Sequence, residues 1–131
     1  MKVYIAGPMT GLPQNNFPAF DAVAAYMRGV GHVVISPAEL DDPVDRDLAL
    51  KDLPATKTWG DFLARDVKLI ADAGIEAIVL LPFWYDSRGA RLEATVGLLC
   101  GLQFYETNET GRQFNRVRNS DIAQTIANSF K

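Results

Sequence analysis

Glu93 is the residue whose surroundings point most directly to chemistry. It stands alone among small and apolar residues in the stretch "DSRGARLEATVGLLCG", which follows a strand-like run. Taking a carboxylate out of water costs several kcal/mol or more, so an acid placed there needs a partner or a function. We expect Glu93 in the first turn of a helix, where the helix dipole favours its ionised form. A dry, ionised carboxylate can attack an electrophilic carbon or stabilise a cation, as in retaining glycosidases.

A structural role for the same acid is the alternative. Acidic residues are common in the first turn of a helix, where they form a capping box with the residue that caps it. Ser87 or Asp86 would be that cap here. The spacing alone leaves both interpretations of Glu93 open.

Two glycine-containing loops could hold an anion near Glu93. The loop "AGPMTG" has Gly7 and Gly11 at its ends, and such a turn can direct backbone N–H groups at a ligand or simply reverse the chain. Ser87 and Gly89 stand at a helix start, where free N–H groups and the helix dipole attract a phosphate. Arg88, between them, adds positive charge.

The hydrophobic pattern predicts the elements that position these loops. Apolar and β-branched runs predict strands, and apolar residues at helical spacing predict helices. The expected strands are 2–7, 32–36, 75–82 and 102–107, and the expected helices are 17 to about 28, 58 to about 72, 89–101 and 120–130. Prolines and acids dominate 37–57, which we interpret as a long surface loop or lid.

This order of elements predicts the fold class. Strands alternating with helices indicate right-handed βαβ crossovers and a parallel sheet. We therefore expect one α/β domain over residues 1–131, with a flavodoxin-like or Rossmann-like open parallel sheet of four to five strands and helices on both faces. Ligands bind such sheets at the carboxyl ends of the strands, so the loops after the first and third strands should face one crevice.

Composition narrows the classes of partner. The 131-residue chain has a formal net charge of −3, without the basic surface that binding to a nucleic-acid polymer requires. The longest apolar run, "AIVLLPFWY", is too short to span a membrane, and the chain enters its first strand without a leader. One cysteine, Cys100, cannot form a disulfide within the chain, and His32 has no metal ligands at suitable spacing. We expect a cytoplasmic protein without a metal.

Four stretches together resemble a known family. "VYIAGPMTG", "FLARD", "AIVLLPFW" and above all "SRGARLE" are similar to the nucleoside 2-deoxyribosyltransferase-like superfamily, particularly its short, phage-associated branch. The resemblance spans positions 1 to about 107. It implies cleavage of the bond between the sugar C1′ and the base nitrogen, on an α/β sheet, without metal or organic cofactor.

The resemblance also implies roles for individual residues. Glu93 matches the nucleophilic glutamate, Asp66 the acid that assists the leaving base, and Tyr4 the tyrosine that holds the nucleophile. Ser87 matches the serine that contacts phosphate in the nucleoside 5′-monophosphate N-glycosidases. Free-nucleoside transferases tend to carry an acid at that position instead, so Ser87 favours a phosphorylated substrate.

Two positions depart from the pattern of the monophosphate hydrolases. Pro8 and Thr10 stand where those enzymes have a serine and an arginine for phosphate. Arg88 or Arg91 could replace the missing charge, and Asp86 could act as the acid of a transferase.

The expected activity is N-glycosidic cleavage of a nucleoside 5′-monophosphate. A base-exchanging deoxyribosyltransferase is the alternative, and a nucleotide-binding protein without turnover is a further one. One aromatic residue among Phe83, Trp84 and Tyr85 could stack on the base. The expected catalytic residues are Glu93, Asp66 and Tyr4, and the expected substrate-binding residues are Gly7, Met9, Thr10, Gly11, Trp84, Ser87, Arg88 and Gly89.

The helix expected at 89–101 also predicts self-association. It is apolar on more sides than one sheet face can cover, which is typical of a helix that packs against another subunit. We expect a homodimer or larger assembly, to which the 107–120 segment could supply groups for a neighbour's site.

Overall fold

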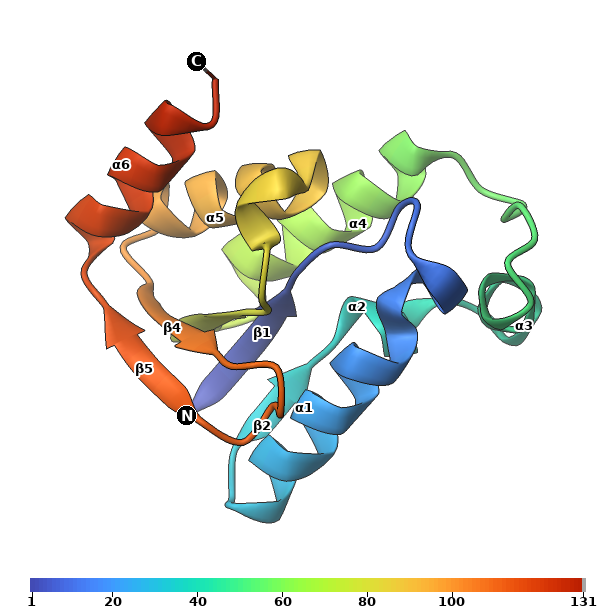
Figure 1. The fold of residues 1–131 in the computed structure, drawn as a ribbon, viewed down its shortest axis with the longest axis horizontal. Helices are drawn as coiled ribbons and strands as arrows, with labels where there is room; N and C mark the ends of the chain where they lie inside the picture. The colour runs from blue at the N-terminus through green and yellow to red at the C-terminus, as the bar shows by residue number, and fades with distance from the viewer. Residues whose placement is uncertain (131) are drawn as a thin grey trace.

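Five strands form a single open sheet in the computed structural model, which describes residues 1–130. The strand order is β2-β1-β3-β4-β5, as Figure 1 shows for most of the strands. The first four strands are parallel and β5 is antiparallel to β4. The strands are β1 (Lys2–Ala6), β2 (Val33–Ile35), β3 (Ala77–Leu80), β4 (Gln103–Thr107) and β5 (Phe114–Val117).

This arrangement confirms the predicted α/β fold with an open, flavodoxin-like sheet. Four of the strands are parallel as predicted, and the sheet has in addition an antiparallel edge strand that we did not predict, where β5 pairs back on β4 from within the 107–120 segment. A short connection returns the chain beside the strand it has just left, which only an antiparallel pair allows. The 107–120 segment was a candidate to supply groups to the site of a neighbouring subunit. Part of it instead forms a strand of this sheet.

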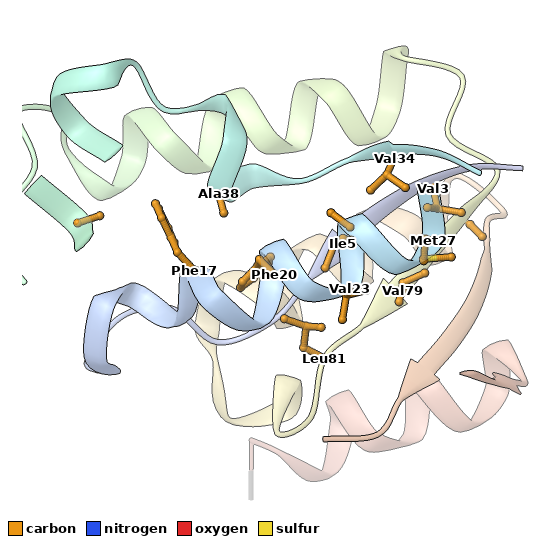
Figure 2. Packing of buried hydrophobic residues seen from close by; sticks show 13 residues of the cluster. Val3, Ile5, Phe17, Phe20, Val23, Met27, Val34, Ala38, Val79 and Leu81 are labelled. Atoms are coloured by element: carbon orange, nitrogen blue, oxygen red, sulfur yellow. The ribbon is translucent and has the colours of Figure 1, made fainter. Parts of the chain in front are cut away.

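Helices cover both faces of the sheet (Figure 1). One apolar cluster joins α1 to Val3, Ile5 and Val79, and Figure 2 shows the α1 side chains Phe20 and Val23 packed there. A second cluster lies on the opposite face, beneath α4, α5 and α6. The helical segments are η1 (Pro13–Asn16), α1 (Phe17–Gly29), α2 (Pro37–Leu40), α3 (Pro43–Leu50), α4 (Trp59–Asp72), η2 (Trp84–Asp86), α5 (Arg88–Leu99) and α6 (Asn119–Asn128).

Strand alternation decides where Tyr4 points. Successive side chains of a strand face opposite sides of the sheet. Val3 and Ile5 belong to the α1 side, whereas Tyr4 and Ala6 belong to the cluster under α4 and α5. The Tyr4 hydroxyl is thereby directed at the two helices that carry Asp66 and Glu93.

A glycine allows α5 to lie close to the sheet. A Cβ atom built on Gly97 would lie 2.4 Å from Ile78 Cδ1 and 3.0 Å from Phe104 Cζ, so this position has no room for a side chain. Such an approach of backbone to side chain is open only to glycine. It brings the inward face of α5, including Glu93, down onto the sheet.

The 37–57 segment is not the continuous loop that its composition predicts. It contains α2 and α3, and the Asp42 side chain accepts a 2.8 Å hydrogen bond from the Asp45 N–H at the start of α3. A capping aspartate followed by Pro43 is a regular helix start, because proline needs no N–H partner there. The same prolines and acids that suggested a loop therefore begin two short helices.

Candidate active site

A cavity of about 580 Å³ opens at the carboxyl ends of the parallel strands. Its lining comes from the loop after β1, the α2–α3 segment, the first half of α4 and the start of α5. The loops after the first and third strands thus share one crevice, at the edge of the sheet where open α/β folds bind their ligands.

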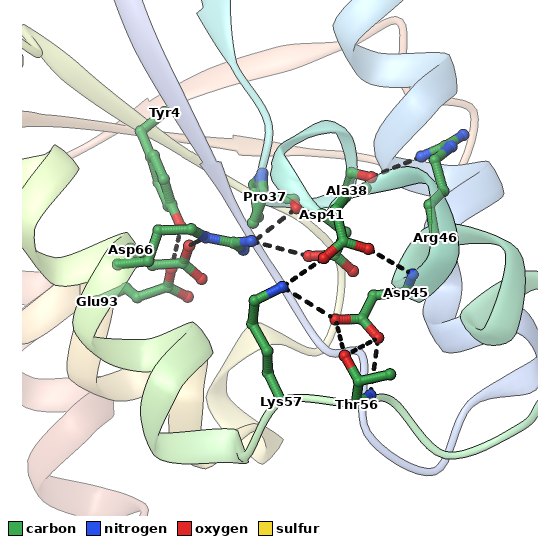
Figure 3. Close-up of polar contacts among 12 residues, drawn as sticks. Tyr4, Pro37, Ala38, Asp41, Asp45, Arg46, Thr56, Lys57, Asp66 and Glu93 are labelled. Atoms are coloured by element: carbon green, nitrogen blue, oxygen red, sulfur yellow. Dashed lines mark hydrogen bonds and ion pairs between the residues drawn. The ribbon is translucent and has the colours of Figure 1, made fainter.

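Glu93 and Asp66 lie together in the wall of this cavity, next to the Tyr4 hydroxyl. The Tyr4 hydroxyl donates a hydrogen bond to Glu93 Oε2, and Figure 3 shows the Asp66 carboxyl beside this pair. Tyr4 is completely buried, and Glu93 and Asp66 are only 6% and 8% exposed. The three residues come from β1, α4 and α5, and the fold brings them together as the sequence motifs predict.

Glu93 lies deeper along its helix than we expected. α5 begins at Arg88, so Glu93 is its sixth residue and belongs to the second turn. The capping position is taken by Ser87, whose side chain accepts a 3.2 Å hydrogen bond from the Ala90 N–H. The expectation of a first-turn acid is therefore wrong, and the capping-box alternative for Glu93 falls with it.

Burial, rather than the helix dipole, controls the protonation of Glu93. Loss of water raises the pKa of its carboxyl to about 8, and the nearby Asp66 charge acts in the same direction. The Tyr4 hydrogen bond and the Arg65 charge lower this pKa without cancelling the effect of burial. The dipole acts mainly within the first turn, which Glu93 has left. Contrary to the expectation of an ionised side chain, this environment favours the protonated form of Glu93.

Asp66 shares this buried environment but has a cation next to it. Burial raises the pKa of the Asp66 carboxyl above its ordinary value, while the charge and hydrogen bond of Arg65 and the nearby Tyr4 hydroxyl oppose the rise. Arg65 Nε donates to Asp66 Oδ1 at 2.9 Å. Two neighbouring carboxyls with different partners release their protons unequally.

Six of the eight residues expected to bind substrate line the cavity. Ser87, Gly89 and Arg88 do so from the start of α5, and the other three are Gly7, Met9 and Thr10. The Arg88 guanidinium carbon lies 4.6 Å from the centre of the Trp59 ring, which holds this side chain at the rim. The Arg91 side chain instead donates to the Tyr85 carbonyl, outside this lining.

Gly11 and Trp84 lie outside the cavity. Gly11 adopts a φ of +85° in the turn after β1, which explains the glycine there as a requirement of the backbone. The Trp84 side chain is 2% exposed and belongs to the core cluster beneath α4 and α5. The prediction that Trp84 binds substrate is wrong for this structure, because its ring packs beneath α5 in the core.

The aromatic walls of the cavity are Trp59, Phe62 and Phe17. Trp59 and Phe62 belong to the apolar stripe of α4, which the sequence pattern indicates as a core-facing surface. The first turn of α4 extends past the sheet, so this part of the stripe faces the cavity. The sequence offered one signal that these residues line the cavity. They stand at the start of a helix that follows the long 37–57 segment.

A second polar cluster holds the opposite wall. Asp45 is completely buried and accepts hydrogen bonds from the Thr56 N–H at 2.7 Å and the Thr56 hydroxyl at 2.8 Å (Figure 3). Lys57 Nζ lies 3.2 Å from Asp45 Oδ2 and 2.5 Å from Asp42 Oδ2. These contacts fasten α3 to the segment entering α4, so the insertion forms a fixed wall of the cavity.

The loop after β1 reaches the same wall in an unusual conformation. Gln14, Asn15 and Asn16 have φ values of 53°, 51° and 60°, in the left-handed region that L residues rarely occupy consecutively. The Gln14 N–H and side-chain amide bind Asp52 and the Leu50 carbonyl, which fixes the turn against the end of α3. Asn15 lines the cavity as a result.

Residues 1–130 contain no cluster of three or more histidine, cysteine, aspartate or glutamate side chains arranged to hold a metal ion. No helix within the same residues has the length and apolar character needed to cross a membrane.

The chain was compared with known proteins and families. The comparison with curated proteins found no match, and the comparison with solved structures also found none. A family described as a domain of unknown function, DUF4406, matches residues 1–105. The matched range includes all of the residues that line the cavity as well as Tyr4. The chain therefore belongs to the DUF4406 family.

Proposed function

We propose that this chain cleaves the N-glycosidic bond of a nucleoside 5′-monophosphate, with Glu93 as the nucleophile. The observation that carries the proposal is the Tyr4–Glu93–Asp66 group, a pair of carboxyls almost removed from water in the wall of a ligand-sized cavity. A site that only binds a ligand gains nothing from two desolvated acids, whereas a glycosidase needs both.

The proposed reaction divides the work between the two carboxyls. A Glu93 carboxylate oxygen bonds to C1′ while the bond from C1′ to the base nitrogen breaks, and the bonding electrons leave with the base. Asp66 gives its proton to that nitrogen. Water then attacks C1′ of the glycosyl ester as Asp66 takes up a proton from it, and Glu93 leaves as a carboxylate. The products are the free base and a sugar 5-phosphate.

Tyr4 orients the nucleophile in this scheme. Its hydroxyl holds Glu93 Oε2, which leaves the other carboxylate oxygen to face C1′. Because Glu93 has a pKa of about 8, the reactive form with ionised Glu93 and protonated Asp66 is a minority at neutral pH. The positive charge that develops on the sugar ring favours this form as the bond breaks.

The start of α5 supports a phosphate on the substrate. Gly89 and Ser87 line the cavity where α5 begins, so the backbone N–H groups of the first turn and the positive end of the helix lie beside it. Arg88 stands at the same rim. The aromatic faces of Trp59 and Phe62 offer stacking surface for a base.

Free-base release tests the proposal directly. The purified chain is incubated with ribo- and 2′-deoxyribonucleoside 5′-monophosphates of each common base, and chromatography follows the appearance of free base. Release that requires the 5′-phosphate supports the proposal. Tight nucleotide binding without release over hours would contradict it and leave a binding protein.

A base-exchanging transferase is the second candidate, because Asp86 lines the cavity next to Ser87 and could accept a sugar 5′-hydroxyl. The same assay separates the two activities when a second free base is added. A new nucleoside carrying that base would identify the transferase, and accumulation of sugar phosphate would identify the hydrolase.

We further propose that the chain works in the cytoplasm and as a homodimer or larger assembly. α5 leaves Leu92 39% and Leu99 85% exposed, which is apolar surface that a second copy would cover. Light scattering at micromolar concentration should return a multiple of the 14.4 kDa chain. A monomer mass would remove this proposal and leave the proposed chemistry intact.

A further inference from the structure

One guanidinium links the acid at the reaction centre to the insertion that forms the cavity wall. Arg65 Nε donates to Asp66 Oδ1 at 2.9 Å, and its Nη1 donates to Asp41 Oδ1 at 2.8 Å. Its Nη2 also lies 3.4 Å from the Pro37 carbonyl oxygen. Arg65 and Asp66 belong to α4, whereas Asp41 and Pro37 belong to the α2 region.

These contacts lie where charges interact strongly. The side chains of Arg65, Asp66 and Asp41 are 27%, 12% and 9% exposed. The Phe62 ring supports the guanidinium, with the Arg65 Cζ atom 5.3 Å from the ring centre. Charge-assisted hydrogen bonds are about twice as strong as neutral ones. In partly buried sites, added salt weakens the attraction between the charges less than it does at the surface.

The charged and titratable groups around Asp66 come from four elements. Tyr4 approaches from β1, Glu93 from α5 and Asp41 from the end of α2, and Arg65 is the neighbour on α4 itself. Arg65 thus brings positive charge to a group that includes three carboxyls. Its position between two of them determines how much of that charge Asp66 experiences.

The sharing of the Arg65 guanidinium between Asp66 and Asp41 matters when the base departs. Asp66 changes from a carboxylic acid to a carboxylate as it gives up its proton, and the Arg65 bond strengthens as the negative charge appears. If Arg65 were bound to Asp66 alone, the carboxylate would be so well stabilised that reprotonation would become difficult. Asp41 prevents this by holding the other end of the guanidinium.

We propose that Arg65 is a positioning residue that controls proton release by Asp66, and that Asp41 limits this control by competing for the same guanidinium. The catalytic consequence rests on the function proposed above, but the electrostatic arrangement does not. Arg65 therefore also couples the α2–α3 insertion to the reaction centre.

Titration of Asp66 tests the proposal without any substrate. The side-chain carbons of aspartate are labelled with ¹³C and followed by NMR in the Glu93→Gln background, so that no second carboxyl of the pair titrates. The Asp66 signal is assigned by its loss in Asp66→Asn. Arg65→Gln should raise the Asp66 pKa by about one unit or more, because the opposite charge is removed. Arg65→Lys, which keeps the charge, should restore most of the difference.

Asp41→Asn should shift the same pKa in the opposite direction. It removes a neighbouring negative charge and weakens the bond that competes for the Arg65 guanidinium, and both changes favour the Asp66 carboxylate. Structural damage alone would not move the pKa in opposite directions in the two variants. An unchanged Asp66 pKa in Arg65→Gln, or a shift of the same sign in both, would overturn the proposal. If Arg65→Gln does not fold, a raised or unchanged pKa in Asp41→Asn overturns it equally.

Turnover separates this inference from the proposed function. If Asp66 is the general acid, the pH limit of kcat/KM that Asp66 sets should move upward in Arg65→Gln and downward in Asp41→Asn, each in a chain that retains Glu93. Opposite pKa shifts without any base release would support the role of Arg65 and contradict the glycosidase. Base release with unmoved pKa values would support the glycosidase and overturn the role of Arg65.

Discussion

Glu93→Gln should lower the rate of base release from a nucleoside 5′-monophosphate by about 10³-fold or more. Glutamine has nearly the shape of protonated glutamate and still accepts a hydrogen bond from Tyr4, but it cannot form the glycosyl ester. Loss of a nucleophile removes the whole covalent route, and the remaining rate comes from binding and from stabilisation of charge. The measurement is the single-turnover rate of free-base formation, followed by chromatography.

The control for this variant is Asp72→Asn. It makes the same carboxyl-to-amide change on α4, where Asp72 is exposed and pairs with Lys68. It should release base at the wild-type rate. The wild-type kcat/KM should also fall above about pH 8, where both Glu93 and Asp66 are ionised and no proton is left for the base. Retention of activity in Glu93→Gln would exclude Glu93 as the nucleophile.

The Glu93→Gln substitution should also stabilise the protein at alkaline pH. The folded state raises the pKa of Glu93 to about 8, above the ordinary value of 4.5 that the unfolded chain has. The folded state therefore binds this proton more tightly, so the contribution of Glu93 to stability is greatest below about pH 4.5 and is lost as the pH rises through 8. At 1.36 kcal/mol per unit, the loss attributed to Glu93 is on the order of 5 kcal/mol.

Glutamine has no proton to lose and avoids this destabilisation. The free energy of unfolding of Glu93→Gln, relative to wild type, should be near zero at pH 5 and favour the variant by several kcal/mol at pH 9. Urea unfolding at pH 5, 7 and 9 measures the difference. Asp66 titrates in both proteins, so most of its own contribution cancels. A difference that does not change with pH would show that Glu93 is well solvated.

The pattern of the sequence was sufficient for the main framework of the fold. The run around β3 is wholly apolar because that strand is covered on both faces, and helix starts such as Thr58 and Ser87 are marked by residues that bind free N–H groups. These are local interactions, between residues a few positions apart. Local chemistry therefore predicted the order of elements along the chain, and through it an open sheet and the edge where ligands bind.

The sequence also identified the candidate acids, but it did not predict their environment. Glu93 and Asp66 lie in short motifs that resemble those of glycosyl-transferring enzymes, and Tyr4 lies in the first strand. The motifs do not contain the helix boundary that places Glu93 in the second turn, nor the burial that raises its pKa. Burial depends on how closely α5 approaches the sheet, which Gly97 permits through contacts with β3 and β4.

The sequence by itself determined the α/β framework, the edge of the sheet that holds the site and three of its side chains, because each of these leaves a periodic or motif-length signal. Tertiary structure alone decided that Trp84 belongs to the core, that Trp59 and Phe62 face the cavity, and that Arg65 joins Asp66 to Asp41. Periodicity reports which side chains avoid water, not what they face. Charge and desolvation act through space between distant segments, so their balance at Glu93 exists only in the folded chain.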